Sequence, residues 1–218
     1  MMAENARTAK KRFGMLIDLA ACVGCNACVV ACKQENDLPV ENFNTWIESW
    51  DAGRYPHTKR ANLPKLCNHC TDAPCISVCP TGASHVAEGG MVLIDESKCI
   101  GCRYCMAACP FQVRWQSDAS GAVQKCTFCF ERAQAGLLPA CAGNCPTGAR
   151  LFGDMNDPAS EIAQRIGQME TEGLLPELGI GTHVRYIGLT RLMEQPVTSA
   201  VFHGGRVVVP YEGEGEVI

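Results

Sequence analysis

The sequence predicts an α+β fold that consists of two similar modules, one insertion and a C-terminal extension. Three observations lead to this prediction. Sixteen of the 218 residues are cysteines, and they fall into four groups of four with none left over. Two short stretches of sequence each occur twice, which indicates duplication. Aromatic residues make up only 6% of the chain, so something other than large side chains must fill part of the interior.

The cysteines of each group are closely spaced. The four sets are Cys22, Cys25, Cys28 and Cys32; Cys67, Cys70, Cys75 and Cys79; Cys99, Cys102, Cys105 and Cys109; and Cys126, Cys129, Cys141 and Cys145. Sets one and three read C-x2-C-x2-C-x3-C, set two reads C-x2-C-x4-C-x3-C, and set four reads C-x2-C-x11-C-x3-C. A proline follows the last cysteine of sets two, three and four.

The spacing of sets one and three is that of bacterial ferredoxins that hold two iron–sulfur clusters. The first three thiolates surround one cluster, and the fourth, about one helical turn further on, ligates the neighbouring cluster. The following proline restricts the backbone before it to extended or turn conformations. The small residues Gly24, Ala27 and Gly101 leave room for a cluster and expose amide N–H groups toward it. The sequence therefore predicts four [4Fe-4S] clusters.

Other uses of these cysteines fit the spacing less well. Structural zinc takes two cysteine pairs that are separated by an intervening segment. A disulfide framework is typical of small secreted chains without a large core, and the C-x3-C-x2-C loop of radical enzymes does not occur. Zinc and disulfides remain the alternatives to iron. Since every set is complete, a histidine such as His69 is expected to make hydrogen bonds or to be exposed rather than to bind metal.

The repeated sequences indicate how the sets pair. GMLIDLAACVGC before set one resembles MVLIDESKCIGC before set three, and CPTGASHV at the end of set two resembles CPTGARLF at the end of set four. The segment between sets two and three reads as a hairpin with its corner at Gly89-Gly90, which makes 67–110 one module. The other module is then discontinuous, 13–32 plus 126–153, and strand 14–18 is expected to pair with 150–153.

Exchange of the fourth ligand within each module gives four explicit ligand sets. They are Cys22, Cys25, Cys28 and Cys145 for cluster 1; Cys126, Cys129, Cys141 and Cys32 for cluster 2; Cys67, Cys70, Cys75 and Cys109 for cluster 3; and Cys99, Cys102, Cys105 and Cys79 for cluster 4.

Two segments lie outside this pattern. Residues 33–66 form an aromatic insertion, read as a long loop, in which Trp46, Trp50 and Tyr55 either dock a partner or cover a small core. Inside set four, FERAQAGLLPA predicts a short helix and a turn. In the C-terminal extension, 154–218, Asp157-Pro158 is expected to begin a helix that ends near Gln168. HVRYIGL then predicts a strand, VTSAVFH and RVVVPY a hairpin, and EGEGEVI a mobile acidic end.

The net charge and the N-terminal sequence restrict the possible partners and location of the chain. With 19 basic and 23 acidic residues, the chain has no basic excess, so nucleic acid is not an expected partner. The N-terminus lacks the apolar stretch of a signal peptide, and no apolar run is long enough to span a membrane. The chain is expected to be cytoplasmic, or exported with a partner that carries the signal. No catalytic motif occurs, and an enzyme in its own right is the least favoured reading.

The four motifs CVGCNACVVAC, LCNHCTDAPCISVCPTGA, CIGCRYCMAACPF and KCTFC…CAGNCPTGA resemble those of the four-cluster iron–sulfur subunits of the dimethyl sulfoxide reductase superfamily. The resemblance implies two ferredoxin-like modules related by a pseudo-twofold axis. It also implies a large catalytic subunit with a molybdenum or tungsten pterin cofactor, and often a quinone-reactive membrane subunit. Some relatives replace one cysteine of set three and hold a three-iron cluster there. Cys102 fills that position here, so four [4Fe-4S] clusters are expected.

The leading hypothesis is an electron-transfer subunit between that catalytic partner and a quinone-linked or other redox partner. Four clusters in line serve conduction, whereas one cluster is enough for structure. The alternatives are a free polyferredoxin carrier, or the relay subunit of a tungsten aldehyde oxidoreductase, a formate dehydrogenase or a hydrogenase.

Overall fold

The computed structural model describes residues 10–54, 56–194, 201–203 and 206–208. The strands are β1 (Phe13–Asp18), β2 (Thr45–Arg54), β3 (His57–Leu66), β4 (Ser84–Val86), β5 (Val92–Ile94), β6 (Trp115–Gln116), β7 (Val123–Gln124), β8 (Arg150–Asp154), β9 (Val184–Ile187), β10 (Val201–His203) and β11 (Arg206–Val208). The helices are α1 (Ala27–Glu35), α2 (Pro74–Ser77), α3 (Tyr104–Ala107), α4 (Phe130–Gln134), α5 (Ala140–Gly143), α6 (Glu161–Gln168) and α7 (Leu189–Met193), with 3-10 turns η2 (Glu88–Gly90) and η3 (Pro176–Leu178).

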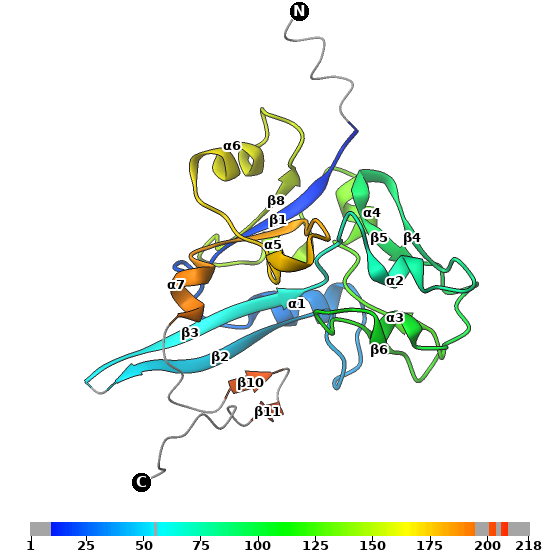
Figure 1. Ribbon diagram of the computed structural model, residues 1–218, viewed down its shortest axis with the longest axis horizontal. Helices are drawn as coiled ribbons and strands as arrows, with labels where there is room; N and C mark the ends of the chain where they lie inside the picture. Colours follow the sequence, from blue (N-terminus) through cyan, green and yellow to red (C-terminus); the bar gives the residue numbers. More distant parts are fainter. Residues whose placement is uncertain (1–9, 55, 195–200, 204–205, 209–218) are drawn as a thin grey trace, which may run out of the picture.

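A three-stranded sheet of order β8-β1-β9 forms one part of the molecule (Figure 1). Strand β1 pairs antiparallel with β8, so that Met15 lies opposite Phe152, and this confirms the predicted pairing of 14–18 with 150–153. The predicted strand within 183–189 is also present as β9. Its parallel pairing with β1, which sets Ile17 opposite Tyr186, was not predicted. The sequence carries no local signal for a contact over such a separation.

The predicted hairpin between sets two and three is confirmed. Strands β4 and β5 pair antiparallel, with Val86 opposite Val92, and η2 forms the corner. Gly89 and Gly90 take φ values of 75° and 72°, a left-handed conformation that glycine adopts without steric cost. A Cβ on Gly89 would lie 2.2 Å from Cδ2 of Phe13, the first residue of β1. Glycine at this corner therefore also lets the hairpin pack closely against β1.

The insertion is a long β-hairpin, and the prediction of a loop is wrong. Strands β2 and β3 pair along their whole length, from Thr45 opposite Leu66 to Arg54 opposite His57. Strand β3 contains Pro64, although proline cannot donate to a ladder. It is tolerated since β3 is the outer strand of the sheet ordered β11-β10-β2-β3. The hairpin runs beneath α1 and the first sheet and extends beyond them (Figure 1).

The tryptophans of the insertion lie inside the molecule. Trp46 is 6% exposed and Trp50 is 5% exposed, and both belong to the hydrophobic core. Of the two readings offered by the sequence, coverage of the core therefore holds for these two side chains. Tyr55 lies outside the described residues.

The extension begins its helix later than predicted. Helix α6 starts at Glu161 because Ser160 is its N-cap, with Oγ accepting a hydrogen bond from Ala163 N at 3.2 Å. Asp157 instead accepts from Ala159 N at 2.9 Å in a turn before the helix. The predicted hairpin is present where it is described, as β10 paired with β11. The acidic residues 212–218 lie outside the described part of the chain.

A row of rings links the first sheet with the cysteine loops. Phe13 stacks on Phe152 with ring centroids 5.4 Å apart, Phe152 meets Phe128 edge-on at 5.4 Å, and Phe128 stacks on His69 at 3.8 Å. His69 is fully buried, and its Nδ1 accepts a hydrogen bond from Val92 N at 3.0 Å. The expectation that this histidine makes hydrogen bonds is thus confirmed.

His183 joins the start of the chain to the loop of set two. Its Nδ1 lies 3.0 Å from Phe13 O, and its Nε2 lies 3.2 Å from both Arg12 Nε and Thr71 Oγ1. This pattern suits a neutral ring with the proton on Nδ1, since Arg12 must donate to Nε2. Burial, reinforced by the Arg12 guanidinium, lowers the pKa of His183 to about 4.

The stability of the protein should therefore fall in mild acid through His183. The unfolded chain takes up a proton near the ordinary histidine pKa of 6.5, whereas the folded chain resists it down to about 4. The stability that comes from keeping His183 neutral is thus present above about pH 6.5 and is lost as the pH falls from 6.5 towards 4. Between pH 7.5 and pH 5 the loss is about 2 kcal/mol. Urea unfolding of His183→Gln should depend on pH less steeply than that of the wild type, and parallel profiles would contradict the assignment.

Candidate iron–sulfur centres

The loops of sets one and three have the same local conformation. Gly24 and Gly101, each just before the second cysteine of its set, have φ values of 68° and 67°. Asn26 and Arg103, each just after it, have φ values of 60° and 64°. A short helix, α1 or α3, follows in both and carries the third cysteine. The sequence repeat is therefore a repeat of backbone geometry as well.

Sets two and four form a second matching pair. His69 and Phe128 precede the second cysteine of their sets with φ values of 43° and 57°. At the end of each set a threonine hydroxyl lies 3.7 Å from the last cysteine sulfur, Thr81 from Cys79 and Thr147 from Cys145. The rings of His69 and Phe128, at equivalent positions, are the two that stack on each other.

Two cavities are each bounded by four cysteines that come from distant parts of the chain. The lining cysteines are Cys22, Cys25, Cys28 and Cys145 in one cavity, and Cys32, Cys126, Cys129 and Cys141 in the other. Helix α1 contributes Cys28 to the first and Cys32 to the second, because residues four apart lie one turn apart on a helix. Helix α5 packs against α1 and carries Cys141.

The remaining cysteines lie on the loops around α2 and α3, which pack against each other. The thiols of Cys67, Cys75 and Cys109 act electrostatically on Cys70 and, together with burial as the larger cause, raise its pKa to about 12. Cys79 Sγ accepts from Ser84 N at 3.4 Å, and Cys99 Sγ accepts from Val123 N at 3.4 Å. Amide donors thus point at sulfur in both halves of this region.

The donor chemistry fits iron–sulfur clusters better than the alternatives. All sixteen cysteines are free thiols, so no disulfide framework is present. Around one zinc ion, with about 2.3 Å to each sulfur, thiolates stand about 3.8 Å apart. Within the described ranges, no three His, Cys, Asp or Glu side chains converge closely enough to hold a single metal ion. A four-iron cluster is wider, and it suits cysteines that line a cavity at larger separations.

Burial disfavours the thiolate form in the cavities when the cysteines are considered alone. Burial, together with the neighbouring thiols of Cys141 and Cys129, raises the pKa of Cys32 to about 12. Burial also holds the pKa of Cys126 well above its usual range. Cluster binding must displace these protons, so that the free energy of binding iron is coupled to folding.

Comparison with known proteins decides the family. Descriptions of a 4Fe-4S dicluster domain match residues 21–83 and, separately, residues 59–155. A tetrathionate reductase subunit from Salmonella typhimurium is 42% identical over 192 residues, which cover 86% of this chain and 77% of that one. The chain belongs to the four-cluster iron–sulfur subunits. It is an electron-transfer subunit, and its two dicluster domains with sixteen cysteines account for four [4Fe-4S] clusters.

Two further relatives of this iron–sulfur subunit cover most of its length. The arsenate respiratory reductase iron–sulfur subunit ArrB of Shewanella sp. strain ANA-3 is 39% identical in a match that covers 81% of this chain and 96% of the relative. The thiosulfate reductase electron transfer subunit PhsB of Salmonella typhi is 45% identical over 163 residues, 73% and 83% respectively. In the part of the subunit that the structure describes, no helix is both long enough and apolar enough to cross a membrane.

The structure adds three functional candidates that the sequence did not single out. The cationic side chains of Arg114, Lys125 and Arg150 are 6%, 2% and 5% exposed. Lys125 directly precedes Cys126, and Arg114 and Arg150 lie five residues after the last cysteine of their sets. A basic residue beside a ligand motif is usually exposed, so position alone did not distinguish these three from Lys98 before Cys99.

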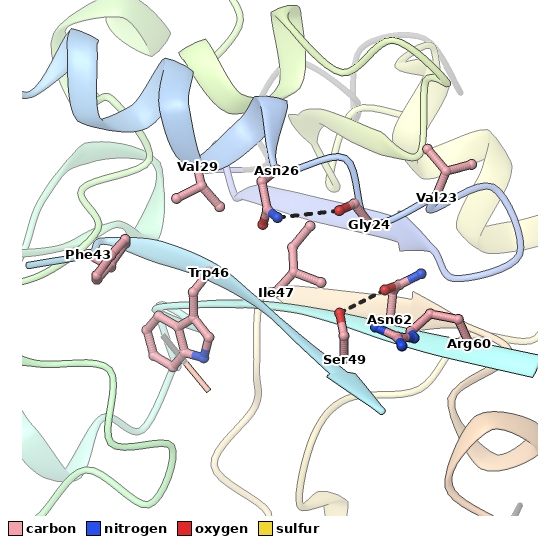
Figure 2. A pocket seen from close by; sticks show the side chains of 10 residues that line it. All are labelled: Val23, Gly24, Asn26, Val29, Phe43, Trp46, Ile47, Ser49, Arg60 and Asn62. Atoms are coloured by element: carbon pink, nitrogen blue, oxygen red, sulfur yellow. Dashed lines mark hydrogen bonds between the residues drawn. The ribbon is translucent and has the colours of Figure 1, made fainter. Parts of the chain in front are cut away.

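A groove of about 580 Å³ opens between the first cysteine loop and the β2–β3 hairpin (Figure 2). Val23 and Gly24 bound it on the loop side, and Trp46 and Arg60 bound it on the hairpin side. Asn62 is held toward Gly24 by a hydrogen bond from Ser49 Oγ to its Oδ1, 2.8 Å long. The insertion thus supports the loop that carries Cys22 and Cys25.

Substitution of Gly24 by alanine should weaken this support and cluster 1 with it. A Cβ at Gly24 would lie 2.5 Å from Asn62 Oδ1, and the residue has a left-handed φ of 68°. Gly82→Ala is the matched control, because Gly82 has a φ of 67° but no atom within 4 Å of the added Cβ. The control should cost only the backbone strain, about 1–2 kcal/mol. Gly24→Ala should cost more and lower the iron content; equal effects in urea unfolding and iron analysis would refute the role of the contact.

Proposed function

We propose that this subunit relays electrons between a large catalytic subunit with a molybdenum or tungsten pterin cofactor and a quinone-linked membrane subunit or another redox partner. The observation that carries the proposal is the meeting of cysteines from opposite ends of the cysteine-bearing region in two shared cavities. A chain that conducts needs its redox centres close together, whereas a single cluster would be enough to hold a fold. The reductases of which its relatives are named subunits support a catalytic partner.

The ligand sets follow the exchange of the fourth cysteine. Cluster 1 is held by Cys22, Cys25, Cys28 and Cys145; cluster 2 by Cys126, Cys129, Cys141 and Cys32; cluster 3 by Cys67, Cys70, Cys75 and Cys109; and cluster 4 by Cys99, Cys102, Cys105 and Cys79. The cavity linings support the first two sets. The electrostatic coupling among the thiols of Cys70, Cys67, Cys75 and Cys109 supports the third.

Hydrogen-bond donors lower the pKa values of two of the cysteine thiols in these ligand sets. Burial raises the pKa of Cys79, but several hydrogen bonds, led by those from the N–H of Ser84 and the hydroxyl of Thr81, together leave the pKa lowered. The same balance holds at Cys145, where the Thr147 hydroxyl and the N–H of Arg150 act against burial. Donors of this kind favour thiolate and are one of the means by which proteins adjust cluster potentials.

The modules meet through their equivalent loops, so that the clusters form one line in the order 1, 2, 3, 4. When bound, the clusters supply one-electron sites through which electrons pass. The stack of His69 on Phe128 joins the loop of Cys67 and Cys70 to the loop of Cys126 and Cys129. Since the two rings occupy matching positions, the stack also supports a pseudo-twofold axis between the modules.

The interface role of residues 33–66 and of 154–218 is part of the same proposal. Trp46 and Trp50 cover the core, and Trp46 also bounds the open groove, which is the docking surface on the insertion. The groove lies beside Cys25, which is exposed, and Val23, which is 64% exposed. A partner seated there would be close to cluster 1, and electron transfer requires that closeness.

Affinity purification of the tagged holoprotein from its native host tests the proposal. We expect a large subunit to be retained in a fixed ratio, and metal analysis of the complex should find molybdenum or tungsten in addition to iron. Substitution of Arg60 by glutamate, on the hairpin side of the groove and outside the cluster cavities, should weaken the association and leave the iron content of the subunit unchanged. Recovery of a stable monomer that donates electrons as a diffusible carrier would refute the subunit role.

A further inference from the structure

Three buried cations lie among the cysteines without an acidic partner. They are Arg114, Lys125 and Arg150. Among the residues that the structure describes, the ion pairs are Arg60–Asp51, Lys65–Glu48, Lys98–Asp95 and Arg132–Glu35, and none involves these three. A buried charge without a counter-charge is costly. The negative charge that balances these three cations must therefore come from a group other than an acidic side chain of the described residues. Each of the three cations lies between cysteines of two ligand sets.

Arg150 lies between the sets of clusters 1 and 2. It lines the cavity of Cys22, Cys25, Cys28 and Cys145. Its Nη2 donates to Thr45 Oγ1 at 2.9 Å, and Thr45 lines the neighbouring cavity of Cys32, Cys126, Cys129 and Cys141. Burial lowers the pKa of the guanidinium, but its electrostatic interactions, led by those with Cys141 and Cys28, one from each set, leave the pKa raised overall.

Lys125 lies between the sets of clusters 2 and 3. Its Nζ donates to Cys126 O at 2.8 Å, and also to Val92 O, whose residue donates through its N–H to His69 in the loop of set two. Burial lowers the pKa of Lys125 and the Arg114 guanidinium lowers it too, while the thiolates of Cys67 and Cys126 oppose the shift. One of these thiolates belongs to each set.

Arg114 lies between the sets of clusters 3 and 4. Its Nη2 donates to Ser84 Oγ at 3.1 Å, and Ser84 N donates to Cys79 Sγ at 3.4 Å. Its Nη1 is buried and has no hydrogen-bond partner. Burial lowers the pKa of this guanidinium, but its interactions with Cys75 and Cys67 of one set and Cys105 of the other together leave the pKa raised.

The duplication does not explain these residues. The position equivalent to Lys125, directly before the first cysteine of its set, is Leu66 in set two. The position equivalent to Arg150, five residues after the last cysteine, is Ser84. The position equivalent to Arg114 is Asp37 after set one. Each cation therefore has no basic counterpart in the other copy of the repeat, where the equivalent residue is neutral or acidic.

We propose that Arg150, Lys125 and Arg114 act as fixed positive charges, each placed between two neighbouring clusters. Each of them raises the reduction potentials of those two clusters. The proposal rests on the ligand sets and cluster order given above. An oxidised four-iron cluster with four thiolates carries about −2, and reduction adds one more negative charge. A fixed positive charge in a medium of low dielectric constant favours the reduced form of both neighbours. Arginine remains charged at any physiological pH.

Potentiometric titration of the holoprotein, followed by electron paramagnetic resonance, tests the proposal. Lys125→Met should shift the potentials of clusters 2 and 3 to lower values and leave clusters 1 and 4 unchanged. Arg150→Gln should shift only clusters 1 and 2, and Arg114→Gln only clusters 3 and 4. Lys98→Met is the matched control, because Lys98 also precedes a cysteine but its side chain is 61% exposed and paired with Asp95. It should shift none of the four.

Charge-conserving variants separate electrostatics from packing. Lys125→Arg, Arg114→Lys and Arg150→Lys should keep all four potentials at wild-type values. If one of the neutral variants loses iron, a second neutral variant, Lys125→Gln, Arg114→Met or Arg150→Met, takes its place. Shifts of the same size in charged and neutral variants would overturn the proposal, as would a neutral variant that moves all four potentials together or none. Iron content and ligand variants of single cysteines test the ligand sets separately, so failure of those sets is distinguishable from failure of the cations to act.

Discussion

Substitution of Cys32 by alanine should remove the cluster of the fourth cysteine set and spare that of the first, although Cys32 belongs to the first set by sequence. The side chain lines the cavity of Cys126, Cys129 and Cys141. Loss of one of four thiolate ligands leaves an iron atom open to solvent and exchange. We therefore expect the four-iron resonance signal of that cluster to be lost, either with a fall of about a quarter in the iron content or with its replacement by the signal of a three-iron cluster.

The assignment needs reference variants whose cluster is not in question. Cys25→Ala defines the signal of the first set and Cys129→Ala that of the fourth, since neither is a fourth ligand. Cys32→Ala should reproduce the spectrum of Cys129→Ala. Cys28→Ala, one turn earlier on α1 and equally buried, should reproduce that of Cys25→Ala. Loss of the first set's signal alone in Cys32→Ala would disprove the exchange of ligands between the halves.

Substitution of Tyr186 by alanine should destabilise the subunit by about 3–5 kcal/mol. Tyr186 is fully buried in β9, and its hydroxyl donates to Pro64 O at 2.9 Å, so the ring connects the first sheet to the insertion hairpin. Removal of the ring leaves a cavity at this junction. Tyr186→Phe should cost only about 1 kcal/mol, because it removes the hydroxyl while keeping the packing.

Unfolding of the holoprotein in urea, followed by tryptophan fluorescence and cluster absorbance, measures both effects. Leu178→Ala is the control within the same extension, since that side chain is 46% exposed and should change stability by no more than about 0.5 kcal/mol. If Tyr186→Ala were as mild as the control, the strand would be a docking element without a part in the core.

Features that depend on neighbouring residues could be predicted from the sequence. The cysteine loops follow this principle, because three ligands of each cluster lie within one short turn. The β4–β5 hairpin is another case, since Gly89 and Gly90 supply the left-handed corner that the turn requires. The pairing of β1 with β8 was also predictable, because the repeated sequences assigned both strands to the same discontinuous module.

The β2–β3 hairpin and the parallel strand β9 were not predictable in the same way. Pro64, Gly53 and the asparagines of the insertion are typical of loops, and the pairing that outweighs them depends on contacts with Tyr186 and α1. The helix start at Ser160 depended on Asp157 forming a local turn with Ala159. Competing short-range hydrogen bonds of this kind have nearly equal free energies, so the surrounding structure selects between them.

By itself, the sequence determined the number of cysteine sets, their chemistry and the half-unit to which each belongs, because ligand spacing is local and is written directly along the chain. Only the tertiary structure decided which cysteines share a cavity, and that Arg114, Lys125 and Arg150 are buried among them. Burial is a property of all the surrounding residues at once. The sequence shows Lys98 and Lys125 in the same position before a cysteine, and only the fold leaves one in water and encloses the other.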